Sequence, residues 1–285
     1  MSGIVWLASY PKSGNTWFRT FISNLLNEKE EEVSINQLKT DGIFSSRHIL
    51  DRITGVKSSN LTFDEIDLLR PVAYNHLAQT VSKNLFIKVH DAYTYLPDGS
   101  PLLGTVKAKA IYILRNPLDV AVSFANHLSK DFDHIIKMMG DESCAFCKHE
   151  YSLPNQLRQR LLTWSSHVEG WTQAKELPIH LVRYEDMKLD PVATFTKAVR
   201  FIGIDCSEEQ IEQAIELSDF EKLKSDEQLQ GFKEKPYKTA AFFRAGQVGD
   251  WRNHLTDKQV EQLLDDHRVM LRKFGYMDDA GNAVY

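Results

Sequence analysis

The chain has 285 residues, 42% of them hydrophobic and 26% charged, which is enough to bury a sizeable core in one large domain or two modest ones. A formal net charge of −5 argues against a general nucleic-acid binder, and no apolar run reaches the roughly 18 residues needed to span a membrane. Three cysteines suit a reducing compartment and no secretory signal pattern is visible, so we expect a cytoplasmic protein without nucleic-acid or membrane partners.

Four short apolar runs are candidates for the buried strands of a parallel sheet. They are Ile4–Ala8, Leu85–Val89, Ala110–Leu114 and Ile179–Val182. Runs that are apolar on both faces are typical of a parallel sheet that is covered on both sides. Helical patterns alternate with these runs. The sequence therefore predicts an α/β fold, with a mainly parallel central sheet flanked by helices, in a single domain over residues 1–285.

Apolar residues spaced three or four apart predict the main helices. One such stripe covers residues 17–26, and another covers residues 256–273. Asn116 and Asp190 each precede a proline, a pair typical of an N-cap followed by proline at the first helical position. We therefore expect helices to begin directly after both residues.

Two polar segments, 27–62 and 129–160, show no clear period. Long excursions in α/β folds often form lids or substrate walls, and we expect substrate-side loops here. Cys144, Cys147 and His149 in the second segment offer three zinc ligands without an evident fourth. We therefore expect no metal at this place.

The stretch Tyr10-Pro-Lys-Ser-Gly-Asn-Thr-Trp17, between the first strand and the first helix, has the composition of a phosphate-binding loop. Such a turn places the N–H groups and the positive end of the helix at the carboxyl end of the strand. Gly14 lets the backbone approach a ligand, and Lys12 adds a positive charge. The hydroxyls of Ser13 and Thr16 can donate hydrogen bonds. The alternative is a simple turn with Lys12 in water. The ATPase pattern is not met, because the lysine precedes the only glycine.

A second candidate anion site follows the strand that ends at Leu114. Arg115 comes next, a helix begins after Asn116, and Ser123 lies two helical turns further along. A guanidinium beside a helix start suits a phosphate, because its fork bonds two oxygens at once. The alternative is a structural ion pair between Arg115 and Asp119.

A candidate base follows the strand at residues 85–89. Lys88 and His90 are one residue apart and so lie on the same side of an extended strand. Ligands of α/β folds bind at the carboxyl ends of the strands, and a histidine there can take a proton from a hydroxyl at neutral pH. The alternative is that His90, one of ten histidines, is structural.

These stretches resemble motifs of the cytosolic-type sulfotransferases. The first loop resembles that family's YPKSGTTW loop, with Asn15 in place of a threonine. The resemblance implies that residues 12–17 hold the 5′-phosphosulfate end of 3′-phosphoadenosine-5′-phosphosulfate (PAPS). The segment beginning at Arg115 resembles the motif RNPxDVxVS, which implies that Arg115 and Ser123 bind the 3′-phosphate.

Further segments resemble the same family. Phe243–Asn253 resembles the segment RKGxxGDWKN, which implies that Arg244, Ala245 and Gly246 complete the 3′-phosphate site, with Ala245 in place of a lysine. The adenine-contacting positions of the family are matched by Trp17, Tyr184, Ser218 and Phe220. The triplet Lys88-Val-His90 resembles KTH, which implies His90 as the general base and Lys88 as its companion near the acceptor. Ser123 is further implied to hold Lys12 before the acceptor arrives.

The resemblance implies a sulfotransferase that moves the sulfuryl group of PAPS to a hydroxyl of a small-molecule alcohol or phenol, by in-line attack and without a metal. Two alternatives stay open: a P-loop kinase that uses ATP and Mg²⁺, with an acid from Arg183-Tyr-Glu-Asp186, and a catalytically inactive nucleotide-binding protein. The segment Arg252–Glu261 resembles the family's dimer motif KxxxTVxxxE, with arginine for lysine and Asp257 for valine, and it allows a homodimer.

Overall fold

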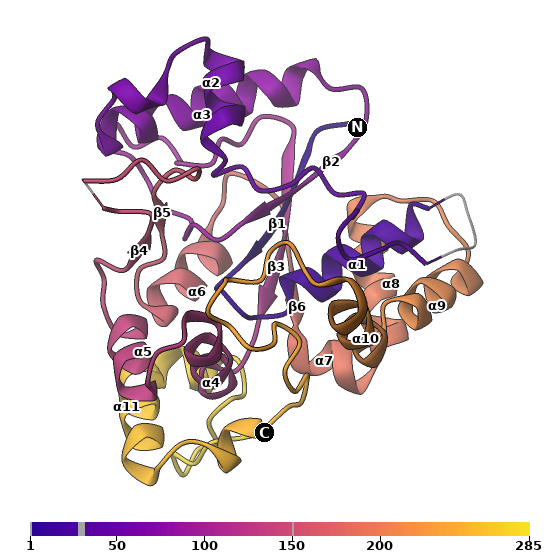
Figure 1. Cartoon of the computed structure of the whole chain (residues 1–285), viewed down its shortest axis with the longest axis vertical. Coiled ribbons are helices and arrows are strands. Elements are labelled where there is room, and N and C mark those ends of the chain that lie inside the picture. The colour runs from indigo at the N-terminus through magenta and orange to yellow at the C-terminus, as the bar shows by residue number, and fades with distance from the viewer. Residues whose placement is uncertain (1, 28–31, 150) are drawn as a thin grey trace. The chain divides into compact units, whose positions relative to one another are not determined.

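The computed structural model describes residues 2–27, 32–149 and 151–285, and it contains a four-stranded, mainly parallel sheet in the order β2-β1-β3-β6 (Figure 1). The strands are β1 (Ile4–Ser9), β2 (Leu85–Val89), β3 (Ala108–Leu114) and β6 (Ile179–Arg183). β1 and β2 pair in parallel, with Ile4 opposite Leu85 and Ala8 opposite Val89. All six residues of β1 are buried, as a strand covered on both faces requires. The predicted strands and the α/β class are confirmed.

The helices alternate with these strands along the chain. They are α1 (Asn15–Leu25), α2 (Arg47–Thr54), α3 (Phe63–Thr80), α4 (Pro117–Leu128), α5 (Phe132–Met139), α6 (Trp164–Gln173), α7 (Tyr184–Leu189), α8 (Pro191–Ile202), α9 (Glu208–Leu217), α10 (Phe220–Gln230) and α11 (Asp257–Lys273), with the short 3₁₀ turns η1 (Ser58–Asn60) and η2 (Asp250–Asn253) and the hairpin strands β4 (Ala145–Phe146) and β5 (Gln159–Arg160). Both predicted N-caps form, because Asn116 Oδ1 accepts from the N–H of Leu118 at 3.0 Å and Asp190 Oδ1 from that of Ala193 at 3.1 Å. The predicted starts of α4 and α8 are therefore confirmed.

The chain divides into two compact units, and the first contains most of the sheet. It consists of Met1–Tyr10, Asp41–Tyr112 and Asp141–Leu181. Helix α3 packs on β1, where the ring centroids of Tyr74 and Trp6 are 5.3 Å apart. Helix α6 packs on β3, where Trp171 stacks on Tyr112 at 5.8 Å. Large aromatic side chains thus form the core of this unit.

The second unit is mainly helical and consists of Pro11–Thr40, Ile113–Gly140 and Val182–Tyr285. Helix α1 packs against α8 and α9, and the ring centroids of Phe21 and Phe195 are 4.1 Å apart. Helix α4 packs against α5 and η2. The predicted phosphate loop and the predicted second anion site both belong to this unit.

Parts of the two predicted substrate-side segments lie together in the first unit. The N–H of Arg47 donates to the carbonyl of Asn155 at 3.0 Å, and that of Leu157 donates to the carbonyl of Ser45 at 2.6 Å. The segments are more regular than expected, because they contain α2, α5 and the β4–β5 hairpin. Residues 28–31 and 150 of these segments lie outside the described residues. The role of the segments as substrate walls stays a prediction.

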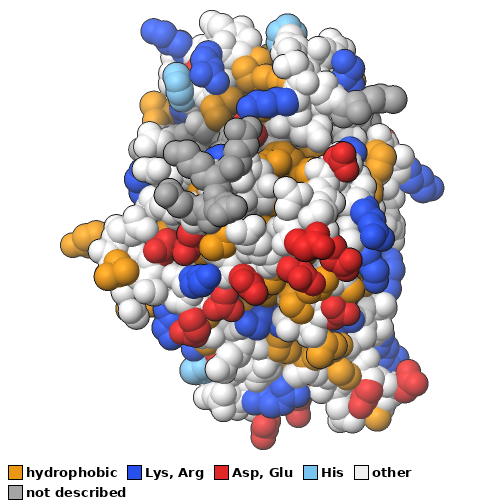
Figure 2. Space-filling model, turned by 90° about the vertical axis from the view of Figure 1, so that its right-hand side faces the viewer, with side chains coloured by type: hydrophobic (Ala, Val, Ile, Leu, Met, Phe, Trp, Pro, Cys, Tyr) orange, Lys and Arg blue, Asp and Glu red, His pale blue; other side chains and the backbone are white. Residues whose placement is uncertain are grey.

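On the face of the molecule drawn in Figure 2, many acidic side chains gather across the middle, with basic side chains and small hydrophobic groups around them. This mixture agrees with the small net charge of the sequence. Among residues 2–27, 32–149 and 151–285, no helix is long and apolar enough to cross a bilayer.

Candidate nucleotide-binding and transfer site

The loop between β1 and α1 has the backbone geometry of an anion-binding turn. Lys12 and Gly14 both adopt left-handed conformations, with φ of 68° and 103°. Gly14 is the N-cap of α1, and a Cβ atom at this position would lie 2.7 Å from the ring of Tyr184. Only glycine fits, because both the conformation and the contact exclude a side chain. The first-turn N–H groups of α1 have no acceptor within the helix and can bind an anion.

Three buried polar atoms around this loop have no hydrogen-bond partner among the described residues. They are Ser13 Oγ, Trp17 Nε1 and Arg115 Nε. Buried polar groups in proteins are almost always paired, so such atoms point to a ligand. The indole and guanidinium nitrogens can only donate, and the hydroxyl can donate as well. The set therefore fits a ligand that is rich in acceptor oxygens.

Arg115 links the first loop to the C-terminal segment. Its side chain is buried, its Nη1 donates to the carbonyl of Lys12 at 3.2 Å, and its Nη2 donates to that of Gln247 at 3.0 Å. The guanidinium carbon lies 4.2 Å from the ring centroid of Tyr184. Because both terminal nitrogens are engaged by carbonyl groups, the position of the guanidinium is fixed before any ligand arrives. Residues of three predicted motifs are thus brought together.

The ion pair between Arg115 and Asp119, which was the alternative to a phosphate site, forms only at long range. The distance from Arg115 Nη2 to Asp119 Oδ2 is 3.7 Å. The same carboxylate accepts from the N–H of Gly249 at 2.9 Å and from that of Trp251 at 3.1 Å. Asp119 therefore chiefly anchors the C-terminal segment, and Arg115 keeps its Nε donor for another partner.

The predicted C-terminal clamp residues lie next to α10. Gly246 has a φ of 63°, and a Cβ atom there would meet the ring of Phe220 at 2.4 Å. Arg244 donates to the carboxylate of Asp250 and, at 3.2 Å, to Nε2 of His254. Ala245 between these residues contributes no charge. Contacts of Arg244, Ala245 and Gly246 with a phosphate stay predictions.

The predicted adenine-binding residues surround one cation. The ammonium of Lys188 lies 5.4 Å from the ring centroid of Trp17 and 5.8 Å from that of Phe220. Tyr184 meets Trp17 edge-on at 5.7 Å. Ser218 is fully buried, and its hydroxyl donates to a carbonyl of α9 at 2.6 Å, which leaves its oxygen able to accept. Trp17 and Phe220 therefore both face the position of this ammonium.

The side chain of Lys12 rests on an aromatic ring that the sequence did not single out. Its ammonium lies 3.6 Å from the ring centroid of Phe242, a cation–π contact. The N–H groups of Phe242 and Phe243 donate to the carboxylate of Glu227 at 2.7 and 2.8 Å. Glu227 of α10 therefore holds the ring that carries Lys12. Ser123 lies half-buried in α4, and its contact with Lys12 stays a prediction.

His90, the predicted base, has a defined ring orientation. Its Nδ1 lies 2.9 Å from the carbonyl oxygen of Ser9. A carbonyl can only accept, so Nδ1 donates this hydrogen bond and the contact orients the ring. Lys88 lies in β2, and its N–H donates to the carbonyl of Gly42 at 2.9 Å. The role of His90 as the base stays a prediction.

Two buried groups hold the main chain around His90. Nε2 of His167 donates to the carbonyl of His90 at 3.2 Å, and the hydroxyl of Tyr112 lies 3.0 Å from Nδ1 of His167. Burial lowers the pKa of His167 to about 3, so this imidazole is neutral at neutral pH. Asp91 follows His90 and makes a doubly hydrogen-bonded pair with Arg70, at 3.0 and 2.7 Å. No local pattern marks these supports in the sequence, because their partners are distant along the chain.

One of the two acids in the segment that a kinase would use has another role. Glu185 accepts from the N–H of Asn116 at 3.0 Å and from the hydroxyl of Tyr276 at 2.6 Å. Burial raises the pKa of this carboxyl group. Glu185 therefore fixes the start of α4.

The cysteines of the second polar segment are free thiols. Burial raises the pKa of Cys144 to about 11, so this side chain is a neutral thiol at neutral pH. A cysteine ligates metal as the thiolate. In the described part of the chain, no three metal-ligating side chains group together.

An α/β fold with a strand–loop–helix anion site at the end of a sheet strand defines a nucleotide-binding class of protein. The family model named "Sulfotransferase domain" matches residues 3–275, and the chain therefore belongs to the sulfotransferase family. A flavonol 3-sulfotransferase of Flaveria bidentis is 28% identical over 275 residues, which cover 91% of this chain and 78% of that protein. An amine sulfotransferase of Oryctolagus cuniculus is 27% identical over 270 residues, covering 91% and 77%. The chain is thus a sulfotransferase.

Solved structures show the same fold. Mouse sulfotransferase SULT7A1 complexed with PAP superposes with a TM-score of 0.60 at 21% identity, over 98% of this chain and 86% of that one. Retinol dehydratase in a complex with retinol and PAP superposes with a TM-score of 0.61 at 21% identity, over 95% of this chain and 82% of that one.

Proposed function

We propose that this chain transfers the sulfuryl group of PAPS to a hydroxyl of a small-molecule acceptor. The observation that carries the proposal is the position of Arg115, which joins the first loop to the C-terminal segment and keeps an unpartnered Nε beside two further unpartnered atoms. Such a set suits a ligand with phosphate groups at two ends. SULT7A1 and retinol dehydratase were solved with PAP, the nucleotide that PAPS becomes when it has lost its sulfuryl group, and this supports PAPS as the donor here.

In this proposal the donor's 5′ end binds the first-turn N–H groups of α1, together with Lys12, Ser13, Asn15 and Thr16. The 3′-phosphate binds Arg115 and Ser123, with Arg244, Ala245 and Gly246 completing its site. The adenine lies between the rings of Trp17 and Phe220, beside Tyr184 and Ser218. Lys188 leaves its position between the two rings when the base enters, because both need the same space.

The reaction needs one proton acceptor and one group that neutralises the leaving oxygen. The oxygen of the acceptor hydroxyl forms a bond to sulfur, while the bond from sulfur to the bridging phosphate oxygen breaks in line with it. The hydroxyl proton goes to Nε2 of His90, whose ring is oriented by the hydrogen bond from Nδ1 to the Ser9 carbonyl. Lys12 and the α1 N–H groups stabilise the negative charge that grows on the 5′-phosphate.

Lys12 must leave the ring of Phe242 to reach the leaving oxygen. A cation–π contact at a partly exposed site is worth only about 0.5–1 kcal/mol, so a phosphate charge can displace it. Ser123 and Lys88 act as auxiliary groups, Ser123 toward Lys12 and Lys88 toward the sulfuryl oxygens.

The two alternatives are weaker. The kinase interpretation lacks a lysine after the glycine of the loop, and Glu185 of its candidate acidic segment is engaged by Asn116 and Tyr276. An inactive binding protein would need neither Lys12 nor His90, and the chain has both. We further propose a cytoplasmic location and no nucleic-acid partner. A homodimer through Arg252–Glu261 also stays a proposal, and the mass in solution, measured by sedimentation equilibrium, would test it.

A thermal-shift panel with turnover tests the proposal. A ligand at a hundredfold its dissociation constant adds roughly 2.7 kcal/mol of stability. We expect 3′-phosphoadenosine-5′-phosphate (PAP) to raise the unfolding temperature without Mg²⁺, and we expect a phenol to release PAP from PAPS. Stabilisation by ATP with Mg²⁺ but not by PAP would favour a kinase. PAP binding without turnover on any phenol, sterol, sugar or amine would favour the inactive protein.

A further inference from the structure

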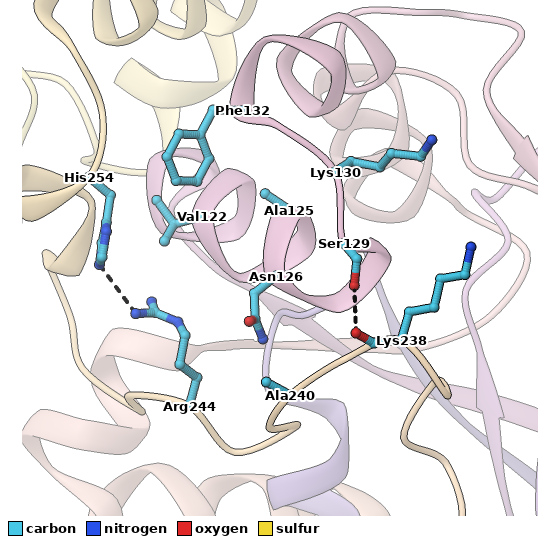
Figure 3. Close-up of a pocket in the computed structure, with 10 residues that line it drawn as sticks. All are labelled: Val122, Ala125, Asn126, Ser129, Lys130, Phe132, Lys238, Ala240, Arg244 and His254. Carbon is cyan, nitrogen blue, oxygen red and sulfur yellow. Dashed lines mark hydrogen bonds between the residues drawn. The ribbon is translucent and has the colours of Figure 1, made fainter.

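An open cavity of about 370 Å³ lies beside α4 in the second unit (Figure 3). Val122, Ala125 and Ser129 line one side of it, on one face of the helix, and Phe132 adds an aromatic wall. Of the residues lining the cavity, Arg244 alone belongs to the predicted donor site. The cavity therefore shares Arg244 with the predicted donor site but is not lined by Arg115.

Two lysines stand at one end of this cavity, as Figure 3 shows. They are Lys130, just after α4, and Lys238. The hydroxyl of Ser129 donates to the carbonyl of Lys238 at 3.0 Å, and the amide of Asn126 donates to the carbonyl of Ala241 at 3.0 Å. These bonds hold the segment of Lys238 against the end of α4, so both lysines line the same end of the cavity. Within the described ranges, neither ammonium group has a carboxylate within ion-pair distance.

The other end of the cavity carries a compensated charge. Arg244 bonds to the carboxylate of Asp250 and to Nε2 of His254 at 3.2 Å (Figure 3). Nε2 of His254 also lies 3.4 Å from the carboxylate of Asp250. Asp250 is therefore shared by the two basic groups at this end. The lysines at the opposite end have no carboxylate within ion-pair distance in the described part of the chain.

We propose that this cavity binds a small organic anion. The apolar body of the ligand packs on Val122, Ala125 and Phe132, and its sulfate or carboxylate group meets Lys130 and Lys238. The volume suits such a ligand, because small-molecule pockets measure about 300–1,000 Å³. An anion at this end of the cavity would be attracted by both ammonium groups. Sulfate esters, which sulfotransferases form, and aryl carboxylates both have this chemistry. Binding does not depend on the donor proposed above.

Isothermal titration of the whole chain tests this site with three probes: 2-naphthyl sulfate, 2-naphthoate and the neutral 2-naphthol. Each is titrated with and without saturating PAP. We expect the anions to bind about tenfold more tightly than the naphthol, and PAP to leave their affinity unchanged. Stronger binding of the sulfate than of the carboxylate would identify sulfate esters as the favoured ligand, and the reverse order would identify carboxylates.

Variants locate the binding. The double variant Lys130→Ala/Lys238→Ala should lose about tenfold in anion affinity, whereas Lys137→Ala, which removes an exposed charge of α5 outside the cavity, should match the parent protein. Ala240→Trp keeps both lysines but fills the cavity, and it should weaken anion binding about as much as the double variant does. Equal affinity of parent and both cavity variants would overturn the proposal. So would equal affinity for the anions and the naphthol. If the parent protein did not bind PAP, that result would contradict the proposed function and leave the cavity proposal untouched.

Discussion

The guanidinium of Arg115 donates a hydrogen bond to the carbonyl of Lys12 at 3.2 Å and so joins two motifs that are 103 residues apart. The same guanidinium bonds to Gln247 at 3.0 Å. Arg115 thus positions the phosphate loop and the C-terminal segment before a nucleotide binds. This prior order reduces the conformational entropy that binding would otherwise lose.

The first prediction concerns the fork geometry of Arg115. Lysine has one terminal nitrogen and cannot span both carbonyl groups, so Arg115→Lys should weaken PAP binding about 10–100-fold. AMP lacks the 3′-phosphate, so the affinity for AMP should fall much less in this variant. Titration calorimetry with both nucleotides measures the difference, and Arg200→Lys on the exposed surface of α8 is the control. An equal loss for PAP and AMP would mean that Arg115 acts only by supporting the first loop.

The second prediction separates catalysis from binding at His90. Because Nε2 of His90 takes the acceptor proton, His90→Ala should lower kcat about 100–10,000-fold. The affinity for PAP should stay within about twofold, since the nucleotide contacts other residues. Single-turnover kinetics and calorimetry give the two values, and His76→Ala, an exposed residue of α3, should behave like the parent protein. Full turnover by His90→Ala would refute the assignment of the base.

The third prediction concerns Glu227. Its two carboxylate oxygens accept from the N–H groups of Phe242 and Phe243, whereas a glutamine has one acceptor oxygen and would turn an NH₂ group toward a donor. Glu227→Gln should therefore destabilise the protein by about 1–3 kcal/mol and lower kcat by misplacing the Lys12 support. Urea unfolding and turnover measure both effects. Glu221→Gln, on an exposed part of α10, should change neither. An unchanged kcat in Glu227→Gln would show that the ring of Phe242 does not govern Lys12.

The fourth prediction is a pH dependence of stability. Burial lowers the pKa of His167 from 6.5 to about 3, so the unfolded chain binds one more proton than the folded chain between these values. Stability should therefore fall as the pH drops below 6.5, with His167 contributing ~2 kcal/mol of the loss at pH 5. Urea unfolding at pH 7 and pH 5 tests this. The variant His167→Gln has no titrating group at this position, so it should lose less stability than the parent protein between pH 7 and pH 5. An identical loss in both proteins would contradict the expected contribution of His167.

Much of the fold, including the strand–loop–helix turn around Gly14, could be predicted because its signals are local. The apolar run at 85–89 coincides with β2, and the Asn116 and Asp190 caps lie beside the helices they start. Helix α3 was not predicted, and Pro71 lies within it, where a sequence pattern suggests a break.

The supports of the site could not be predicted, because each depends on a contact between distant residues. The ring of Phe242 under Lys12 comes from a segment about 230 residues further along the chain, and nothing in either sequence stretch marks the pair. Arg115 and Asp119 allowed either an ion pair or a phosphate site. The structure has the pair at 3.7 Å together with an unpartnered Nε, so the two interpretations are compatible.

A crystal structure of the chain with PAP tests the central proposal most directly. We expect the 5′-phosphate on the first-turn N–H groups of α1 and the 3′-phosphate within hydrogen-bond distance of Arg115, in one continuous nucleotide. A PAP molecule bound with its 3′-phosphate away from Arg115, or bound elsewhere altogether, would contradict the account.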